Sequence, residues 1–311
     1  MKHPFLDHLN KAEENAKIAM DLSSSLPLPF PLSVSRNNVV ITGMGGSGIA
    51  GSMVSEFYDK IPIFLNSGSR LPSAKIHVVI SYSGDTKETL ESFEEGLNRN
   101  LRTICITSGG KLAKRAEENE VDLIKIPSGY LPREAILFML IPALSLFGKL
   151  DEKIPLWLAE MNEKINDEVE EERNPAKKLA AEIGNRIPIV YSYSPFVSLA
   201  KRFKQQVNEN CKGMSFFNLL PELNHNEIES FSKKNKDFIV ISIGDKFDDT
   251  YNIIGGKCEI AGVKLYGRSR IEKLFKTLYF IDYSSVYLAF LRGVDPAEMP
   301  NINRLKSKNQ S

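Results

Sequence analysis

The chain has 311 residues, the size of about two average domains and enough to bury a sizeable core. Hydrophobic residues make up 42% and charged residues 25%, so the composition excludes collagen-like, coiled-coil and largely disordered chains. The 40 basic and 39 acidic residues leave a net charge of +1, which excludes a general attraction for nucleic acid or anionic lipid. Any anion must therefore be held by local geometry.

The cysteines give no sign of a covalent framework. Cys105, Cys211 and Cys258 are far apart and form no CxxC pair, so they indicate neither disulfides nor a thiolate zinc site. The most apolar run, residues 135–147, reaches about two thirds of the roughly 20 residues that a membrane helix needs. The amino-terminal residues lack the apolar core of a signal peptide. We therefore expect a cytoplasmic protein without a membrane span.

The first half of the chain has the alternation of an α/β fold. Residues 5–22 predict a helix, and a proline-rich connector, Pro27 to Pro31, follows. After it, apolar runs alternate with amphipathic stretches. Because parallel strands need crossover connections, this pattern predicts a parallel sheet that is buried on both faces. The predicted strands are 38–42, 61–66, 76–81, 102–107 and 122–126.

A domain boundary is expected near residue 150. Residues 151–174 are acidic and predict a linker helix, after which the alternation restarts and repeats the first half in outline. We therefore expect a first domain, 1–150, with the helical extension and the ligand loops, and a second domain, 151–311. The predicted elements of the second domain are strand 187–193, helix 195–211, strands 214–220, 237–243 and 259–266, and long carboxyl-terminal helices.

A glycine-rich loop follows the first predicted strand. The sequence GMGGSG at residues 43–48 opens a helix, where glycines let the backbone approach an anion. A dinucleotide site would also need an acid near the end of the second strand, and residues 64–68 contain none. A P-loop kinase would need a lysine after the last glycine, where this chain has Ile49. A tight turn without a ligand remains the structural alternative.

A second loop of this kind, SYSGDT at residues 81–86, follows the third predicted strand. Ligands of open parallel sheets bind beyond the carboxyl ends of the strands, so the two loops are expected to converge on one phosphate. The alternative for Ser83 and Thr86 is that their hydroxyls only cap a helix. The residues expected at the phosphate are Gly46, Ser47, Ser81, Ser83, Gly84 and Thr86.

These two loops resemble those of the sugar isomerase (SIS) domain, an α/β fold that binds phosphosugars. From about residue 38 to 306 the chain resembles the bifunctional phosphoglucose/phosphomannose isomerases, through motifs that occur in order. The resemblance implies two SIS domains, each a parallel sheet flanked by helices, a homodimer, sugar 6-phosphate substrates, and neither metal nor organic cofactor. The motifs are GMGGSGIAG, SYSGDTKET, LPREA, VNENCKG, PELNHNEIE, DYSSVYLAFLRGVDP and INRLK.

Aldose–ketose isomerisation of a sugar 6-phosphate moves a proton between C1 and C2 through a cis-enediol. A carboxylate can take the proton from one carbon and return it to the other. By spacing alone Glu209 is an ordinary helix-end acid, but its place in the NEN motif implies that it is the base. The rival carboxylate, Glu227, is interpreted as a neighbour that orients other groups or faces solvent.

Three further residues carry roles implied by the resemblance. His225 opens the sugar ring and is supplied by the neighbouring subunit, although a lone histidine is more often structural. Arg133 stabilises the enediolate charge, the alternative being a surface cation paired with Glu134. Lys306 assists ring opening, and the alternative is that the nearby Lys308 matches the family's lysine instead. The family often has threonine where this chain has Ala297, which bears on the mannose epimer.

Three alternatives stay open. SIS domains also occur in phosphosugar sensors, but no extension of the size of a DNA-binding module flanks residues 38–306. An isomerase of another sugar phosphate would keep the same fold. A zinc-dependent mannose phosphate isomerase is disfavoured, because no cluster of metal ligands is visible around the histidines, which are His3, His8, His77 and His225.

Overall fold

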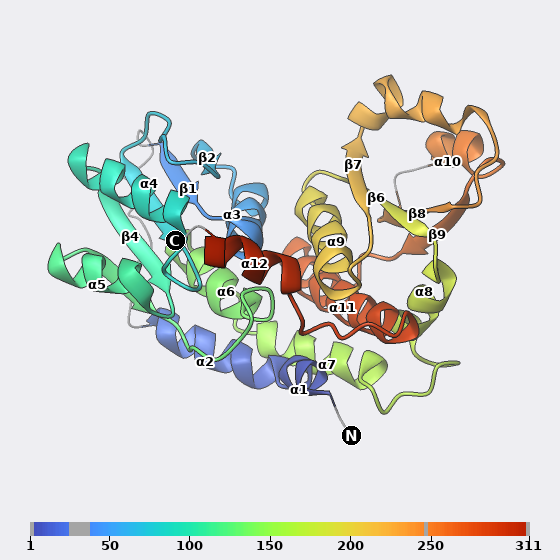
Figure 1. The fold of residues 1–311 in the computed structure, drawn as a ribbon, viewed down its shortest axis with the longest axis horizontal. Coiled ribbons are helices and arrows are strands. Elements are labelled where there is room, and N and C mark those ends of the chain that lie inside the picture. Colours follow the sequence, from blue (N-terminus) through green and yellow to red (C-terminus); the bar gives the residue numbers. More distant parts are fainter. Residues whose placement is uncertain (1–2, 25–37, 246–247, 309–311) are drawn as a thin grey trace. The chain divides into compact units, whose positions relative to one another are not determined.

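The computed structural model describes residues 3–24, 38–245 and 248–308, and these residues divide into two compact units (Figure 1). The five-strand unit contains residues 10–159 and 268–275, and the four-strand unit contains the described parts of residues 1–9, 160–267 and 276–311. The change from one unit to the other falls inside helix α7, Ile154–Ile165. The connector predicted at Pro27 to Pro31 lies outside the described residues.

The five-strand unit is built on a wholly parallel sheet with the order β2-β1-β3-β4-β5. The chain moves from β1 to the edge at β2 and then returns to the other side of β1 with β3. The connections therefore change direction between β1 and β3, which is where sheets of this topology form a ligand-binding crevice at the carboxyl ends of the strands. The strands are β1 Val39–Thr42, β2 Ile63–Asn66, β3 Ile76–Ile80, β4 Arg102–Thr107 and β5 Asp122–Lys125.

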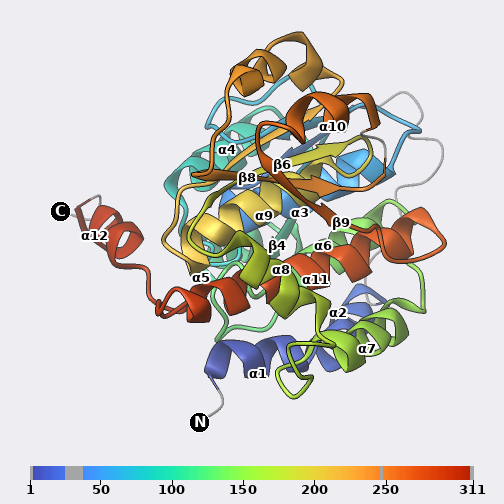
Figure 2. The same cartoon turned by 90° about the vertical axis from the view of Figure 1, so that its right-hand side faces the viewer.

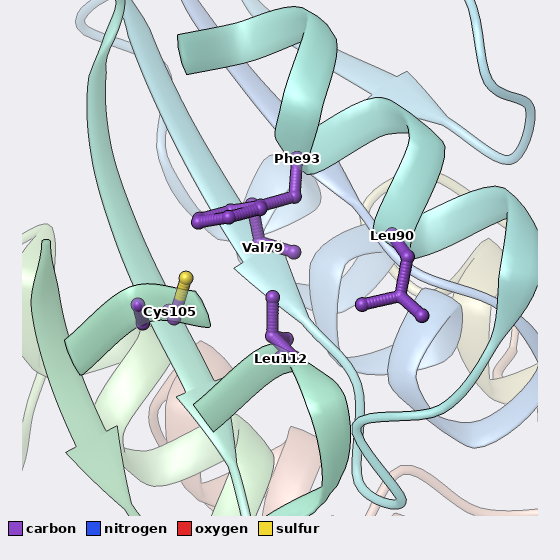
Figure 3. Close-up of a cluster of buried hydrophobic side chains, with 6 residues drawn as sticks. Val79, Leu90, Phe93, Cys105 and Leu112 are labelled. Carbon is purple, nitrogen blue, oxygen red and sulfur yellow. The ribbon is translucent and has the colours of Figure 1, made fainter. Parts of the chain in front are cut away.

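Helices supply the apolar surface that buries this sheet. In α4, leucine and phenylalanine recur every three to four residues, so Leu90 and Phe93 face the sheet together. Figure 3 shows these side chains gathered with Val79 of β3, Cys105 of β4 and Leu112 of α5 in one buried cluster. The helices of this unit are α2 Ala12–Ser24, α3 Gly45–Phe57, α4 Lys87–Asn98, α5 Gly110–Glu118 and α6 Ile136–Leu146.

The four-strand unit also has a wholly parallel sheet, with the order β7-β6-β8-β9. Helix α9 packs along β6 and β7 (Figure 2). The predicted α/β fold with two parallel, helix-flanked sheets is thus confirmed. The strands are β6 Ile187–Tyr193, β7 Phe216–Leu220, β8 Phe238–Ile243 and β9 Glu259–Val263. The helices are α1 Pro4–Asn10, α8 Pro175–Ile183, α9 Val197–Asn210, α10 Asp248–Ile254, part of α11 Arg270–Leu291, and α12 Pro300–Lys308.

The predicted linker helix over 151–174 is wrong beyond Ile165, where α7 ends. The acidic residues that follow form turns. Side chains take the place of helical hydrogen bonds there: the Lys177 ammonium donates to the carbonyls of Asp167 and Val169, and the Asn174 amide donates to the carbonyl of Asn166. The Asn174 side chain also accepts from the first N–H groups of α8, so a new helix begins there.

A buried polar network lies between β1, β3 and α4. Nε2 of His77 is 2.8 Å from the Thr42 hydroxyl, which is 3.2 Å from the Ser92 hydroxyl. The amide of Asn66, at the end of β2, donates to both hydroxyls and to the Gly68 carbonyl. Burial is the main cause that lowers the pKa of His77 from 6.5 to about 4, and Arg99 contributes further. His77 is therefore a neutral structural residue.

The network predicts how stability depends on pH. Between pH 6.5 and about 4 the unfolded chain binds a proton at His77 that the folded chain does not. The contribution of neutral His77 to the unfolding free energy is therefore fully present above pH 6.5 and is lost as the pH falls towards 4. We expect the unfolding free energy of the wild type to fall by about 3 kcal/mol more over this window than that of His77→Asn. Denaturant titrations at several pH values measure this difference. Parallel pH profiles for the two proteins would contradict it.

Candidate active site

The first predicted ligand loop, residues 43–48, stands at the carboxyl end of β1 and opens α3. The turn is tight, since a Cβ on Gly48 would lie 2.6 Å from the Gly43 carbonyl oxygen. The residue before the helix, Met44, provides no side-chain cap, and the first turn holds no acidic residue. The positive end of α3 is thus available to an anion.

The second loop, residues 81–86, stands at the carboxyl end of β3 and opens α4. Gly84 has φ of +70°, and a Cβ there would overlap the carbonyl oxygen of Gly109, so only glycine fits. The Asp85 carboxylate accepts from the Lys111 N–H, and the Ser108 hydroxyl donates to the Tyr82 carbonyl. The loop is therefore fixed against the start of α5.

The hydroxyls of the two loops lie at the crevice between β1 and β3. The Ser47 hydroxyl accepts from the Tyr82 N–H at 3.3 Å, which joins the loops directly. Thr86 precedes α4 as its cap residue, but its side chain makes no capping hydrogen bond. Ser83 accepts a long hydrogen bond, 3.4 Å, from the Asp85 N–H. Helix capping thus does not account for the Thr86 hydroxyl.

Two buried hydroxyls beside these loops lack a hydrogen-bond partner within the described part of the chain: those of Ser81 and of Thr89 in the first turn of α4. Buried polar groups are normally paired, so these two hydroxyls are available to a ligand or a water molecule. Thr89 was not singled out by the sequence. Its motif contains several hydroxyls, and only the packing shows which of them are unpaired.

Arg133 lies in the turn before α6, with its backbone beside the first turn of α3. A Cβ on Gly46 would lie 3.0 Å from the Pro132 carbonyl oxygen and 3.6 Å from Cα of Arg133. Arg133 is only 2% exposed, so the alternative of a surface cation is wrong. Its sequence neighbour Glu134 accepts from the Leu131 N–H. The structure thus brings Arg133 to the same unit and the same crevice as the two loops.

Glu209, the predicted base, is half-buried in the last turn of α9. Its two neighbours hold the turn in place: the Asn208 amide donates to the Gly213 carbonyl, and the fully buried Asn210 amide donates to the Ser285 hydroxyl. The two asparagines of the NEN motif are therefore structural, and they fix the backbone on either side of Glu209.

A buried polar seam attaches this helix to α11. Arg202 and Asp282, which are 2% and 5% exposed, form a bidentate ion pair with distances of 2.8 and 2.7 Å. Gln206 donates to the same carboxylate at 2.9 Å. Arg202, Gln206 and Asn210 recur every four residues and so share one face of α9. No local sequence pattern indicates this seam, because its partners are about 75 to 80 residues apart in the chain.

His225 is exposed at the end of a short 3₁₀ helix, Glu222–His225, that follows β7. Glu227 begins the next 3₁₀ helix, Glu227–Ser232, and anchors the segment: it accepts from the Tyr191 hydroxyl at 2.7 Å and from the Asn218 amide. Burial, together with this carboxylate, raises the pKa of Tyr191. Of the two interpretations of Glu227, orientation of neighbouring groups is the one that the structure supports.

Glu209 and His225 lie at opposite ends of the strands of the four-strand sheet, Glu209 at the amino ends and His225 beyond the carboxyl ends. β6 and β7 are parallel, so α9 must return from the carboxyl edge to the amino edge, where Glu209 ends it. β7 then runs back and delivers His225 beyond the carboxyl edge (Figure 1). The five residues of β7 alone span roughly 16 Å. Within this unit, the two side chains therefore do not share a site.

Lys306 lies in α12, and its side chain is outside the described residues. The N–H of Ala297 donates to the Asp295 carboxylate at 2.7 Å in the turn before this helix. Among residues 3–24, 38–245 and 248–308, no group of three histidine, cysteine or acidic side chains is placed to hold a metal ion. The same ranges contain no helix that is long and apolar enough to cross a membrane.

Known proteins are similar in sequence to this chain over most of its length. Residues 172–308 match the family model of the bacterial phospho-glucose isomerase C-terminal SIS domain. A bifunctional phosphoglucose/phosphomannose isomerase of Caldicellulosiruptor bescii is 37% identical, over 88% of this chain and 89% of its own. The chain belongs to the bifunctional phosphoglucose/phosphomannose isomerase family. The resemblance drawn from the motifs is thereby confirmed.

Two further proteins are similar to this chain, one in sequence and one in structure. A D-glucosamine-6-phosphate 4-epimerase of Sulfolobus acidocaldarius is 33% identical, over 86% of this chain and 88% of its own. The crystal structure of a hypothetical protein of Thermus thermophilus superposes with a TM-score of 0.76 at 15% identity, over 98% of this chain and 89% of that one. At this identity the structure shows the shared fold.

The buried ion pair predicts a large effect on stability. Asp282→Asn leaves the Arg202 guanidinium buried without its countercharge, and we expect the unfolding free energy to fall by about 3–5 kcal/mol. The double variant Arg202→Met/Asp282→Leu removes both charges and should recover much of that loss. Urea denaturation of the three proteins measures both effects. A double variant less stable than Asp282→Asn would contradict this account.

Proposed function

We propose that the chain is an aldose–ketose isomerase that interconverts glucose 6-phosphate, mannose 6-phosphate and fructose 6-phosphate. The observation that carries the proposal is the pair of hydroxyl-rich loops at the crevice between β1 and β3, in a chain that belongs to this family. The N-terminus of α3, which has no acidic residue in its first turn, and two buried hydroxyls without a hydrogen-bond partner among the described residues suit a phosphate monoester.

In this proposal the phosphate is a handle, held by Gly46, Ser47, Ser81, Ser83, Gly84 and Thr86. Gly46 lets the loop come close to Arg133, and Gly84 lets the second loop pack on Gly109. Because the loops are fixed, the bound phosphate keeps the sugar in one position, and the reacting carbons stay in a constant geometry relative to the catalytic groups. No group of the handle takes part in bond breaking.

Glu209 acts as the base that moves the proton between C1 and C2. The carboxylate removes the proton from C2 of an open-chain aldose, which gives a cis-enediolate with its charge on O1. A proton then passes from the C2 hydroxyl to O1, and the carboxylate returns its own proton to C1, which gives the ketose. Glucose and mannose phosphates lose their difference at C2 in this shared intermediate. Rotation about the C2–C3 bond presents the opposite face of C2 to the same carboxylate, and reprotonation there yields the other epimer, so one base suffices for two substrates.

Arg133 supplies the positive charge that stabilises the enediolate oxygens, and its burial keeps that charge from being screened by water. His225 and Lys306 assist ring opening, in which a proton leaves the anomeric hydroxyl and another reaches the ring oxygen. A histidine suits both transfers because one ring nitrogen can donate a proton while the other accepts one.

We infer a homodimer in which His225 of the partner subunit completes the site. The support comes from the four-strand unit, where Glu209 and His225 are held at opposite sheet edges while His225 is exposed. A second subunit related by two-fold symmetry can bring its His225 to the Glu209 that its own unit cannot reach. We also place the enzyme in the cytoplasm, since its three cysteines are free.

A coupled assay tests the isomerase. Purified protein treated with EDTA should form glucose 6-phosphate from fructose 6-phosphate and fructose 6-phosphate from mannose 6-phosphate. Glu209→Gln should lower both rates by at least about 100-fold, because the general base is lost. Glu182→Gln, an exposed acid in the same unit, is the matched control.

The substrate panel also contains glucosamine 6-phosphate, because a relative is named for a reaction of that compound. Turnover of glucosamine 6-phosphate alone would overturn the proposed substrates. Phosphosugar binding without turnover of any substrate would favour the sensor instead.

Subunit mixing tests the shared site. Glu209→Gln and His225→Asn chains, each nearly inactive alone, are denatured together and refolded as a mixture. Random pairing should restore about a quarter of the wild-type rate, because half of the dimers then hold one intact site of two. An unmixed sample of each variant, refolded separately, is the control. A mixture that stays as inactive as its parents would show that His225 acts within its own subunit.

A further inference from the structure

The side chain of Lys212 closes the carboxyl end of helix α9. Its ammonium donates to the carbonyl of Glu209 at 3.0 Å and to that of Asn210 at 3.4 Å. The last carbonyls of a helix have no partner within the helix, and the negative end of its dipole lies there. A lysine at this position therefore satisfies the backbone of the residue that carries the proposed base.

The same ammonium reaches a second segment of the chain. It donates to the Asp295 carbonyl at 2.6 Å, in the turn that leads from α11 to α12. That turn is itself braced, since the Asp295 carboxylate accepts from the Ala297 N–H and lies 3.1 Å from Nε2 of His3. One cation thus joins the end of α9 to the start of the arm in which Lys306 lies.

The backbone of Lys212 supports a role for its side chain. Its φ is +50°, in the left-handed region that glycine usually occupies after a helix. A residue with a side chain is disfavoured in that region, and such strain persists where surrounding contacts hold it. Glycine would suit the turn better, but it could not bridge the three carbonyls.

We propose that Lys212 is a positioning residue for isomerisation, which joins the backbone of Glu209 to the Asp295 turn and keeps the base aligned with the substrate. The inference rests on the proposed function of Glu209. Lys212 itself exchanges no proton with the sugar. Its loss lets the last turn of α9 move, and small displacements of a catalytic group are costly to the rate.

Three substitutions separate positioning from folding. Lys212→Met keeps an unbranched side chain, one atom shorter, but removes the charge, and Lys212→Gly removes the bridge while relieving the left-handed backbone. Lys212→Arg keeps a cation that can reach the carbonyls. The exposed Lys257, in the same unit, provides the matched control Lys257→Met.

We expect kcat for fructose 6-phosphate to fall about 10-fold or more in Lys212→Met and Lys212→Gly, with KM within about 2-fold of the wild type. KM should hold because the phosphate loops belong to the other unit. Lys212→Gly should melt no earlier than the wild type, whereas Lys212→Arg should recover most of kcat.

The outcomes distinguish this inference from the proposed function. A wild-type rate in Lys212→Gly, beside a Glu209→Gln enzyme that is inactive, would overturn the role of Lys212 alone. So would losses of kcat in all three variants that simply follow a lower melting temperature. A wild-type protein that isomerises none of the sugar phosphates would overturn both.

Discussion

The parallel direction of the strands is the constraint on which the rest of this structure depends. Every strand in both sheets runs the same way as its neighbours, so each connection between consecutive strands of a sheet must carry the chain back from the carboxyl end of the strands to the amino end. In the five-strand unit this places the loops after β1 and β3 at one crevice. In the four-strand unit it separates the end of α9 from the segment after β7. One rule of connection therefore brings these two loops together and keeps Glu209 away from the His225 of its own unit.

Polar contacts inside the four-strand unit then give α9 a defined position. An apolar face alone allows a helix to slide or rotate by small amounts. In α9, the bidentate ion pair of Arg202, the hydrogen bond of Gln206 to the same carboxylate and the Asn210–Ser285 hydrogen bond fix the position of the helix on α11. These contacts therefore hold the last turn of α9, in which Glu209 lies, in one position.

Much of the architecture could be predicted from local pattern. The strands of both sheets begin and end within a few residues of their predicted bounds, since buried parallel strands are short apolar runs bounded by loops. The acidic stretch after Ile165 was misinterpreted as helix, because its composition favours helix while the competing contacts from Lys177 and Asn174 come from residues further along the chain. For Arg133 the local sequence allowed two interpretations, a cation at the site or a surface cation paired with Glu134. Only the packing, which buries Arg133, distinguished them.

By itself, the sequence determined the fold class and the family, because these depend on periodicity and on short motifs. The tertiary structure alone decided which hydroxyls remain unpaired, that Arg133 is buried, and that Lys212 connects Glu209 to Asp295. The physical reason is distance along the chain. Lys212 and Asp295 are 83 residues apart, and no local preference records a contact that exists only after two segments have packed together.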